Sequence, residues 1–432
     1  MKDLMLETGF TFDSREVKKD SIFIALSGGL RDGNDFAKKA FEAGAKFLIL
    51  SKEPAFQIPK ERYIVVQDTL NFITELAKNK FEKLLSGGVK TVALTGSIGK
   101  TTAKDFLAFL IKKTGAKVFA SKGNFNNHIG VPISILNAPE GIEFLVLEMG
   151  MNHPEEISHL IKIAPGNIRI ITTVTNAHSG NFADGLFGIA KAKAEILENS
   201  NEDTHFITKK DLEFLPEVIK NFKGKINYLP DISGYKISNG KTFFKIKEKE
   251  YFFNKTVTQN WLTNILIGFE VLNIFKLKYP EDISSFVPPE GRGDETKLSE
   301  NCTLIDESYN ASPEAMLNAI STISLFSGKK LLVLGGMKEL GEEDERKFHD
   351  IIILETIKHP EIEVIFVGYE FKKALQNASL KEYLWFETPE DLIENFNQNH
   401  DFNFILAKSS NSSGISKFTA FLKRKAHEGL NL

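Results

Sequence analysis

The clearest pattern in the chain is a short apolar run followed by apolar residues at helical spacing. Residues 89–95 are mostly apolar and β-branched and follow a pair of glycines, so they predict a buried strand. From residue 103 to residue 111, apolar side chains recur at helical intervals, which predicts a helix that stops near Gly115. Similar alternations of strand and helix continue along the chain, and they predict an α/β fold with mainly parallel sheets.

The pattern falls into three parts, which we expect to form three domains. Residues 1–86 predict a small α/β domain, residues 87–295 a parallel-sheet nucleotide-binding domain, and residues 296–432 a Rossmann-like α/β domain. The last boundary follows the breaker cluster at 288–293. Further strands are expected at 21–26, 47–50, 144–147, 168–174, 302–306, 330–336, 364–368 and 403–407. Hairpin strands are expected between 236 and 253, around an Asn239-Gly240 turn. Helices are expected at 36–44, 188–197, 260–269 and 314–325.

Between the strand at 89–95 and its helix lies Gly96-Ser97-Ile98-Gly99-Lys100-Thr101. Two glycines let backbone N–H groups curl around an anion at the positive end of a helix. Lys100 can reach the outer phosphates of a nucleotide, and the Thr101 hydroxyl can ligate Mg²⁺. Leu94 stands where the usual phosphate-loop pattern has its first glycine. The alternative is an ordinary strand-to-helix turn, but the context on both sides favours a phosphate loop.

Composition narrows the class of protein. A chain of 432 residues with 42% hydrophobic and 26% charged residues is ordinary for a globular protein. A formal net charge of -3 gives no reason to expect nucleic acid as a partner. The single cysteine, Cys302, excludes an internal disulfide framework and fits a reducing compartment. Without a secretory apolar region or a membrane-spanning run, the sequence predicts a cytoplasmic protein with no membrane insertion.

Several polar side chains are placed where chemistry could occur. Glu148 follows the strand at 144–147, and a carboxylate at the carboxyl end of a parallel strand suits a divalent ion near nucleotide phosphates. His178 lies just past the strand at 168–174, although a single histidine is more often a surface or core residue. Lys191 and Lys193 lie on an Ala-rich helix, where basic residues normally form a solvated face.

Two further segments carry candidate binding residues. Residues 124–132 combine three amides and an imidazole, which suit a polar ligand, although the chain is rich in asparagine and an ordinary turn is the alternative. Ser14 and Arg15 lie in a loop, where an arginine can bind phosphate but is more often solvated. The Gly335-Gly336 turn is not a dinucleotide fingerprint and is interpreted as a tight strand exit.

Taken together, these segments resemble the Mur ligases, the ATP-dependent amide-forming enzymes of peptidoglycan precursor synthesis. The resemblance covers nearly the whole chain in order, and residues 122–132 are its most specific part. This part is similar to the branch that adds D-Ala-D-Ala to UDP-N-acetylmuramoyl-tripeptide. The resemblance therefore implies that D-Ala-D-Ala and UDP-N-acetylmuramoyl-tripeptide are the small-molecule substrates. It also implies a monomer whose first domain binds the UDP-sugar. The matching motifs lie at 13–15, 23–26, 32–33, 95–102, 122–132, 148–154, 306–313 and 334–341.

The resemblance implies roles for individual residues. Lys100 would hold the β- and γ-phosphates, and Thr101 would bind one Mg²⁺. Glu148 and His178 would bind a second Mg²⁺. Lys193 is similar to a lysine that many members carbamylate, which would turn a cation into an anion for a metal site. The catalytic set is therefore Lys100, Glu148, His178 and Lys193. The implied ATP-binding residues are Gly96, Ser97, Ile98, Gly99, Lys100, Thr101, Thr102, Asn260, Asn264, Arg292 and Asp306. The implied UDP-sugar-binding residues are Ser14, Arg15, Asn124, Asn126, Asn127 and His128.

The chain also departs from the family pattern. Residues 172–178 read Thr-Thr-Val-Thr-Asn-Ala-His, whereas family members usually have Thr-Asn-Val-Gly-x-Ala-His. Gly336 stands where an acid is common, and residues 408–411 read Lys-Ser-Ser-Asn in place of the usual Lys-Gly-Ser-Arg. The last two changes fall where ADP and the incoming dipeptide are expected. Two alternatives stay open: a related ligase that adds one amino acid to a UDP-muramoyl peptide or glutamate to a folate, and a nucleotide-dependent switch. The folate alternative leaves residues 1–86 unexplained, and a switch would not need Glu148, His178 and Lys193 together.

Overall fold

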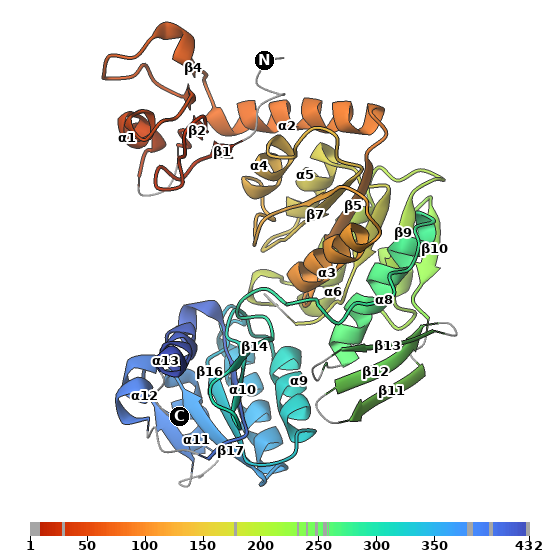
Figure 1. Cartoon of the computed structure of the whole chain (residues 1–432), viewed down its shortest axis with the longest axis vertical. Helices are drawn as coiled ribbons and strands as arrows, with labels where there is room; N and C mark the ends of the chain where they lie inside the picture. The colour runs from red at the N-terminus through yellow and green to blue at the C-terminus, as the bar shows by residue number, and fades with distance from the viewer. Residues whose placement is uncertain are drawn as a thin grey trace.

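The computed structural model is an α/β protein whose N-terminal, central and C-terminal sheets follow one another along the longest axis (Figure 1). It describes residues 9–27, 31–176, 179–230, 233–238, 241–246, 249–253, 257, 259–377, 383–396 and 401–428. Among these residues, no helix is both long and apolar enough to cross a membrane. The divisions at 86/87 and 295/296 remain predictions.

The N-terminal sheet has four parallel strands in sequence order. Its apolar strands pack against a short helix on one face through Phe23, Leu48 and Ala37. The long helix α2 then leads to the central region (Figure 1). The elements are β1 (Phe10–Thr11), β2 (Ile22–Ile24), α1 (Ala37–Glu42), β3 (Phe47–Leu50), β4 (Tyr63–Val65) and α2 (Thr69–Ser86).

The central sheet has six parallel strands in the order β10-β9-β8-β5-β7-β6. Its strands are β5 (Lys90–Thr95), β6 (Val118–Ala120), β7 (Phe144–Glu148), β8 (Ile168–Ile171), β9 (His205–Thr208) and β10 (Lys225–Tyr228). The helices are α3 (Lys100–Lys113), α4 (Gly130–Leu136), α5 (Glu156–Ile163), α6 (Gly185–Ala194), α7 (Leu215–Val218) and α8 (Gln259–Ile274).

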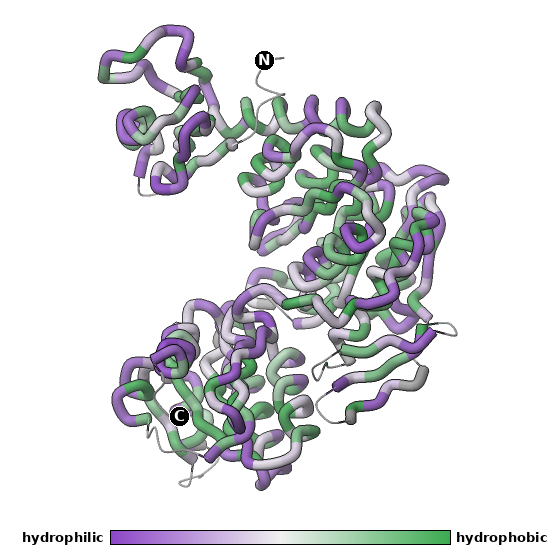
Figure 2. Tube along the Cα trace, in the orientation of Figure 1, coloured by the Kyte–Doolittle hydropathy of each residue, from purple (hydrophilic) through white to green (hydrophobic). Residues whose placement is uncertain are grey.

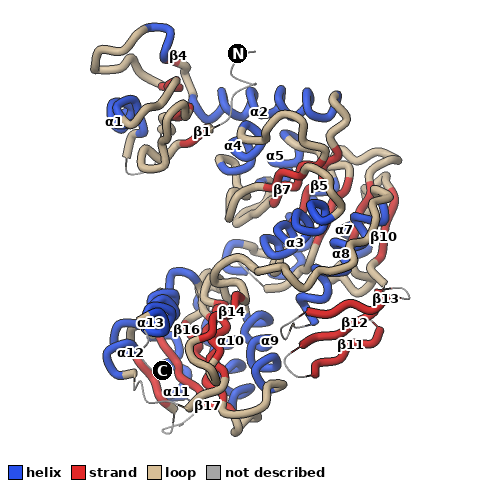
Figure 3. The backbone as a smooth tube through the Cα atoms, viewed as in Figure 1, coloured by secondary structure: helices blue, strands red, loops and turns tan. Residues whose placement is uncertain are grey.

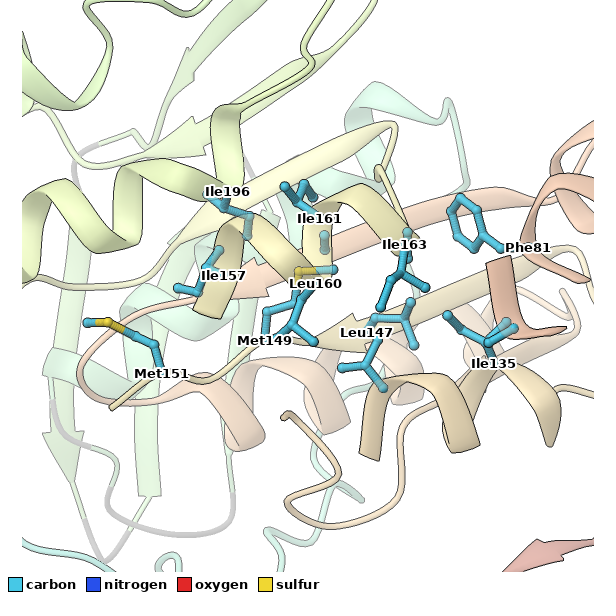
Figure 4. Close-up of a cluster of buried hydrophobic side chains, with 14 of the residues drawn as sticks. Phe81, Ile135, Leu147, Met149, Met151, Ile157, Leu160, Ile161, Ile163 and Ile196 are labelled. Carbon is cyan, nitrogen blue, oxygen red and sulfur yellow. The ribbon is translucent and has the colours of Figure 1, made fainter. Parts of the chain in front are cut away.

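Both faces of this sheet are covered because successive side chains of a strand point to opposite faces. Ala93 of β5 joins a core with α2, α4 and α5, whereas Val92 and Leu94 join another with α3 and α8. Figure 4 shows the first core, in which Leu147 of β7 lies among Phe81 of α2, Ile135 of α4 and Leu160 of α5. Hydrophobic residues follow the buried strands in Figure 2.

A small antiparallel sheet extends the central region. It consists of β11 (Ser233–Ser238), β12 (Lys241–Ile246) and β13 (Lys249–Phe253), which confirms strands between 236 and 253. The predicted Asn239-Gly240 turn lies outside the described residues. Tyr251 and Phe253 on its inner face pack against the core that contains α8.

The C-terminal sheet has the order β14-β15-β19-β16-β17-β18, with β14 antiparallel and the other strands parallel. Helices cover both faces, as Figure 3 shows, and this confirms a doubly wound, Rossmann-like arrangement. Ser312 caps α9 by accepting a hydrogen bond from the Ala315 N–H, with Pro313 at the first helical position. The strands are β14 (Asp294–Lys297), β15 (Thr303–Glu307), β16 (Lys330–Gly335), β17 (Ile362–Val367), β18 (Leu384–Phe386) and β19 (Phe404–Lys408). The helices are α9 (Pro313–Ser324), α10 (Glu342–Ile357), α11 (Tyr369–Asn377), α12 (Pro389–Asn395) and α13 (Ser416–His427).

Candidate functional site

A cavity of about 550 Å³ lies where the carboxyl ends of β5 and β7 face the loop after β15. It therefore joins the central and C-terminal regions at the edge where open α/β sheets bind ligands. A second cavity of about 400 Å³ adjoins it and includes Thr101, Arg292 and Asp306. The predicted residues that line the larger cavity are Ser97, Ile98, Gly99, Lys100, Thr101, Thr102, Asn124, Asn126, Asn127, His128, Glu148, Asn264 and Arg292.

Not every predicted residue could be placed in this site. His178 lies outside the described residues, and Asn260 is in α8 but its side chain is outside the described part of the chain. Ser14 and Arg15 lie in the N-terminal region and line neither cavity. The Arg15 side chain is 80% exposed and pairs with Asp13 at 2.6 Å. The N-terminal UDP-sugar contacts therefore remain predictions.

The phosphate loop is fixed by the segment that follows β8. Ser97 N donates to Thr173 O at 2.9 Å, and Ile98 N donates to the Thr173 hydroxyl at 3.0 Å. A Cβ atom at Gly96, whose φ is +149°, would lie only 1.9 Å from Thr172 Oγ1. Glycine is thus required at this position. The strand predicted at 168–174 ends at Ile171 because the following residues bind the loop instead.

Lys100 begins α3 and folds back onto the loop. Its Nζ donates to Gly96 O at 2.6 Å and to Ser97 O at 3.3 Å. Burial lowers the pKa of Lys100, against the opposing effect of the Glu148 carboxylate. The ammonium therefore lies under the curled loop, at the positive end of a helix, where it can meet a phosphate group.

Glu148, at the end of β7, has a free carboxylate oxygen inside the site. Its side chain is 1% exposed, and Oε1 accepts a hydrogen bond from Asn126 Nδ2 at 2.8 Å. Oε2 is buried and has no hydrogen-bond partner among the described residues. A buried, unpaired carboxylate oxygen is costly unless a cation or donor satisfies it. The unpaired oxygen of Glu148 fits a hard cation such as Mg²⁺, and Thr101 lines the same cavity.

The described residues around Glu148 do not form a complete set of metal ligands. Among them, no group of three or more His, Cys, Asp or Glu side chains is arranged to hold a metal ion. The predicted partner of Glu148, His178, is outside that part of the chain. Both Mg²⁺ sites therefore remain predictions.

The polar turn at residues 124–130 is held by two side chains with structural roles. Asn127 Oδ1 accepts a hydrogen bond at 2.9 Å from the N–H of Gly130, the first residue of α4. Lys104 of α3 is fully buried, and its Nζ donates to Ser121 O at 2.5 Å and Gly123 O at 3.0 Å. Sequence reasoning missed Lys104 because a lysine on a helix usually faces solvent, and its backbone partners are not visible in the periodicity.

The N-terminal region is joined to the same turn unit. Asn137, directly after α4, accepts from Gly9 N and Phe10 N at 2.7 and 2.8 Å and donates to Phe10 O at 2.9 Å. The rings of Phe12 and Phe125 approach to 6.1 Å. These contacts place the N-terminal region beside the polar turn.

Lys193 is buried, with only 2% of its surface exposed. The solvated-face interpretation is therefore wrong for this residue, whereas Lys191 on the same helix is exposed. Burial lowers the pKa of Lys193 well below its ordinary value, and the positive charge of Lys100 lowers it further. Both effects favour the uncharged, nucleophilic form of the amine.

Residues beyond 290 complete the site from the C-terminal side. The Arg292 guanidinium lies 4.0 Å from the centre of the Tyr309 ring and lines both cavities. Asp306 binds Lys423 and Ser308; burial raises the pKa of its carboxyl group, but these hydrogen bonds lower it more. Asp306 is therefore a carboxylate held at the border of the second cavity.

Comparisons with known proteins agree with this arrangement. Residues 94–269 match the family model of the Mur ligase middle domain, and residues 8–81 match that of the Mur ligase family, catalytic domain. Two similar proteins are the UDP-N-acetylmuramoyl-tripeptide–D-alanyl-D-alanine ligases of Buchnera aphidicola subsp. Baizongia pistaciae and of Bacillus subtilis, each 30% identical to this chain. Both alignments cover 97% of this chain, together with 93% of the Buchnera protein and 92% of the Bacillus protein. The crystal structure of MurF ligase from Thermotoga maritima in complex with ADP superposes with a TM-score of 0.83 at 27% identity, covering 99% of this chain and 100% of that one.

Proposed function

Because the chain belongs to the Mur ligase family, we propose that it joins D-Ala-D-Ala to UDP-N-acetylmuramoyl-tripeptide with ATP, as a step of peptidoglycan precursor synthesis. One observation carries the chemistry: Lys100 of the phosphate loop and the unpaired carboxylate oxygen of Glu148 border the same cavity. That cavity also includes the polar turn and residues of the C-terminal region, so it has room for more than a nucleotide.

The reaction proceeds in two steps. The carboxylate of the tripeptide attacks the γ-phosphorus of ATP, which yields an acyl phosphate and ADP. The neutral amine of D-Ala-D-Ala then attacks the acyl carbon to form the amide C–N bond. The bond between the acyl carbon and the phosphate oxygen breaks, phosphate leaves, and the nitrogen loses one proton to solvent. Phosphoryl transfer requires positioning and positive charge, which the loop N–H groups and Lys100 provide.

One Mg²⁺ would be held by the Thr101 hydroxyl, and a second Mg²⁺ by Glu148 and His178. When bound, the ions supply positive charge to phosphate oxygens. Asn126 contributes indirectly, because its hydrogen bond to Oε1 holds the Glu148 carboxylate with Oε2 free.

The nucleotide and the UDP-sugar would lie on different sides of the phosphate loop. Asn264 lies against Gly99, since a Cβ atom added at Gly99 would be 3.1 Å from Asn264 Oδ1. We assign Asn264 and Asn260 to the adenine side of the nucleotide. Arg292 and Asp306 would approach the phosphates and ribose. The UDP-sugar would lie between the N-terminal loop of Ser14 and Arg15 and the polar turn, which presents Asn124, Asn126, Asn127 and His128.

We also propose that Lys193 carries a carbamate. Its neutral amine would add to CO₂ to give a carbamate anion and release one proton. The positive charge of Lys100, which disfavours a protonated Lys193, would favour the anion. The modified side chain could then share a metal with the site around Glu148.

Phosphate release tests the proposed function. The protein is incubated with ATP, Mg²⁺ and UDP-N-acetylmuramoyl-tripeptide, together with either D-Ala-D-Ala or single amino acids. We expect release that depends on D-Ala-D-Ala. Release only with a single amino acid would instead support a related ligase, and nucleotide binding without any acceptor-dependent release would support a switch.

Glu148→Gln should weaken the response to Mg²⁺. The neutral amide keeps the side-chain size but removes the charge of the unpaired oxygen, so the Mg²⁺ concentration for half-maximal phosphate release should rise at least about tenfold. The matched control is Glu143→Gln, since Glu143 precedes the same strand at the opposite end and binds Lys117 N. Equal Mg²⁺ dependence of both variants and the unaltered protein would remove Glu148 from the metal site.

A further inference from the structure

The loop between β16 and α10, residues 336–341, lies where the C-terminal region meets the central region. Glu339 of this loop lines the large cavity. Gly341 meets the backbone of Gly180 so closely that a Cβ atom at Gly180 would lie 2.9 Å from Gly341 N. Gly180 belongs to the turn Ser179–Asn181, which leads into α6 and Lys193. The loop therefore joins the C-terminal region to the segment that carries part of the proposed active site.

The loop is held in an uncommon conformation. Glu339 has a φ of +65°, in the left-handed region that side chains other than glycine rarely adopt. Gly341 follows with a φ of +79°. Such backbone persists only where surrounding contacts impose it, and it is often found at functional sites.

A buried histidine supplies one of those contacts. His349 of α10 is fully buried, and its Nε2 accepts a hydrogen bond from Met337 N at 3.1 Å. Nδ1 lies 2.6 Å from Glu345 O, which can only accept, so Nδ1 carries the proton. The ring of Phe371 packs edge-on at 4.7 Å between ring centres. The imidazole is thus a neutral bridge from the helix to the loop.

This bridge is maintained at neutral pH. Burial lowers the pKa of His349 to about 4, and the charge of Lys338 lowers it as well. The Nε2 lone pair therefore stays available to Met337. The other side of the loop is fixed by Ser410, whose Oγ accepts from Lys338 N at 3.0 Å and whose N–H donates to Gly336 O at 3.3 Å.

We propose that His349 is a positioning residue that, through Met337, seats the 336–341 loop on Gly180 and holds Glu339 at the cavity. The inference rests on the proposed function, because it concerns closure of the C-terminal region around the acyl phosphate. A correctly seated loop keeps water away from that intermediate and aligns the incoming amine. Loss of the bridge affects the acceptor step, whereas nucleotide binding to the central loop is preserved.

Two substitutions separate the two hydrogen bonds of His349. In His349→Gln, the amide oxygen takes the place of Nε2 and accepts from Met337. In His349→Asn, the shorter amide still donates to Glu345 O but ends before Met337. His359→Gln is the control, since His359 lies beyond the same helix and pairs with Glu355 and Glu361.

The variants are compared as full-length proteins by kcat/KM for D-Ala-D-Ala, ADP affinity and hydrogen exchange of the 336–341 amides. We expect His349→Asn to lose at least about tenfold in kcat/KM, with faster exchange at Met337 and unchanged ADP affinity. His349→Gln should restore most of the rate and the protection. Equal turnover of the Asn and Gln variants would overturn the positioning role, as would unchanged exchange in His349→Asn.

Gly180→Ala tests the same contact from the central region. The added methyl group would press on Gly341 N, so we expect a similar loss in kcat/KM with unchanged ADP affinity, and full activity would contradict the seating of the loop. If the unaltered protein shows no release dependent on D-Ala-D-Ala, the proposed function fails. The exchange comparison still decides whether His349 anchors the loop.

Discussion

Lys100→Ala is expected to reduce ATP-dependent phosphate release on the order of 10³-fold, since comparable losses follow removal of a positively charged or hydrogen-bonding group from the phosphoryl-transfer transition state. The Lys100 ammonium lies within 2.6 Å of Gly96 O, inside the loop that would surround the phosphates. No other lysine among the described residues is held by that loop.

The matched control for this prediction is Lys112→Ala, which removes an exposed lysine near the other end of the same helix. Single-turnover phosphate release with the UDP-sugar substrate and circular dichroism would be measured for both variants. Near-normal release by a folded Lys100→Ala protein would refute the assigned role. A loss shared by both variants would point to the helix and not to the phosphate contact.

Lys193→Ala is expected to lower the rate about 100-fold or more, because the proposed carbamate would contribute a metal-binding oxygen. Short carboxylic acids such as formate or acetate should restore part of the activity by placing a carboxylate in the vacated space. Lys191→Ala is the control, since Lys191 is exposed on the same helix and has a cation–π contact with Phe187. Unchanged activity of Lys193→Ala without added acid would remove the carbamate from the mechanism.

The carbamate also predicts a dependence on pH and CO₂. The folded-state pKa of Lys193 is lowered, so the neutral amine that reacts with CO₂ persists to lower pH than it would in an exposed lysine, and it becomes protonated as the pH falls. Acidification and removal of bicarbonate should therefore decrease activity together. Labelled CO₂ followed by ¹³C NMR would detect the adduct in the unaltered protein and not in Lys193→Ala.

Local signals were sufficient for the elements that carry the phosphate chemistry. The apolar run before Gly96 and the helical spacing after Thr101 correspond to β5 and α3. Ser312-Pro313 marks the start of α9 because capping depends on neighbouring residues alone. Glu148 lies at the same cavity as the phosphate loop, since β5 and β7 are adjacent parallel strands and their carboxyl ends meet.

Other features were decided by contacts between distant segments. Lys104 and His349 were not found from the sequence because their partners are backbone atoms, which any residue supplies. Lys193 was assigned to a solvated face by its pattern, yet the packing of α6 buries it. The pairing of residues 172–175 with the phosphate loop shortened a predicted strand for the same reason.

The sequence by itself thus determined the order of strands and helices, the phosphate loop and the family, because periodicity, glycines and motifs are local properties of the chain. Only the tertiary structure decided which polar atoms lack partners and which charges lie side by side. Burial lowers the pKa of Lys193 and of His349, and that burial exists only after helices and strands from distant parts of the chain have packed together.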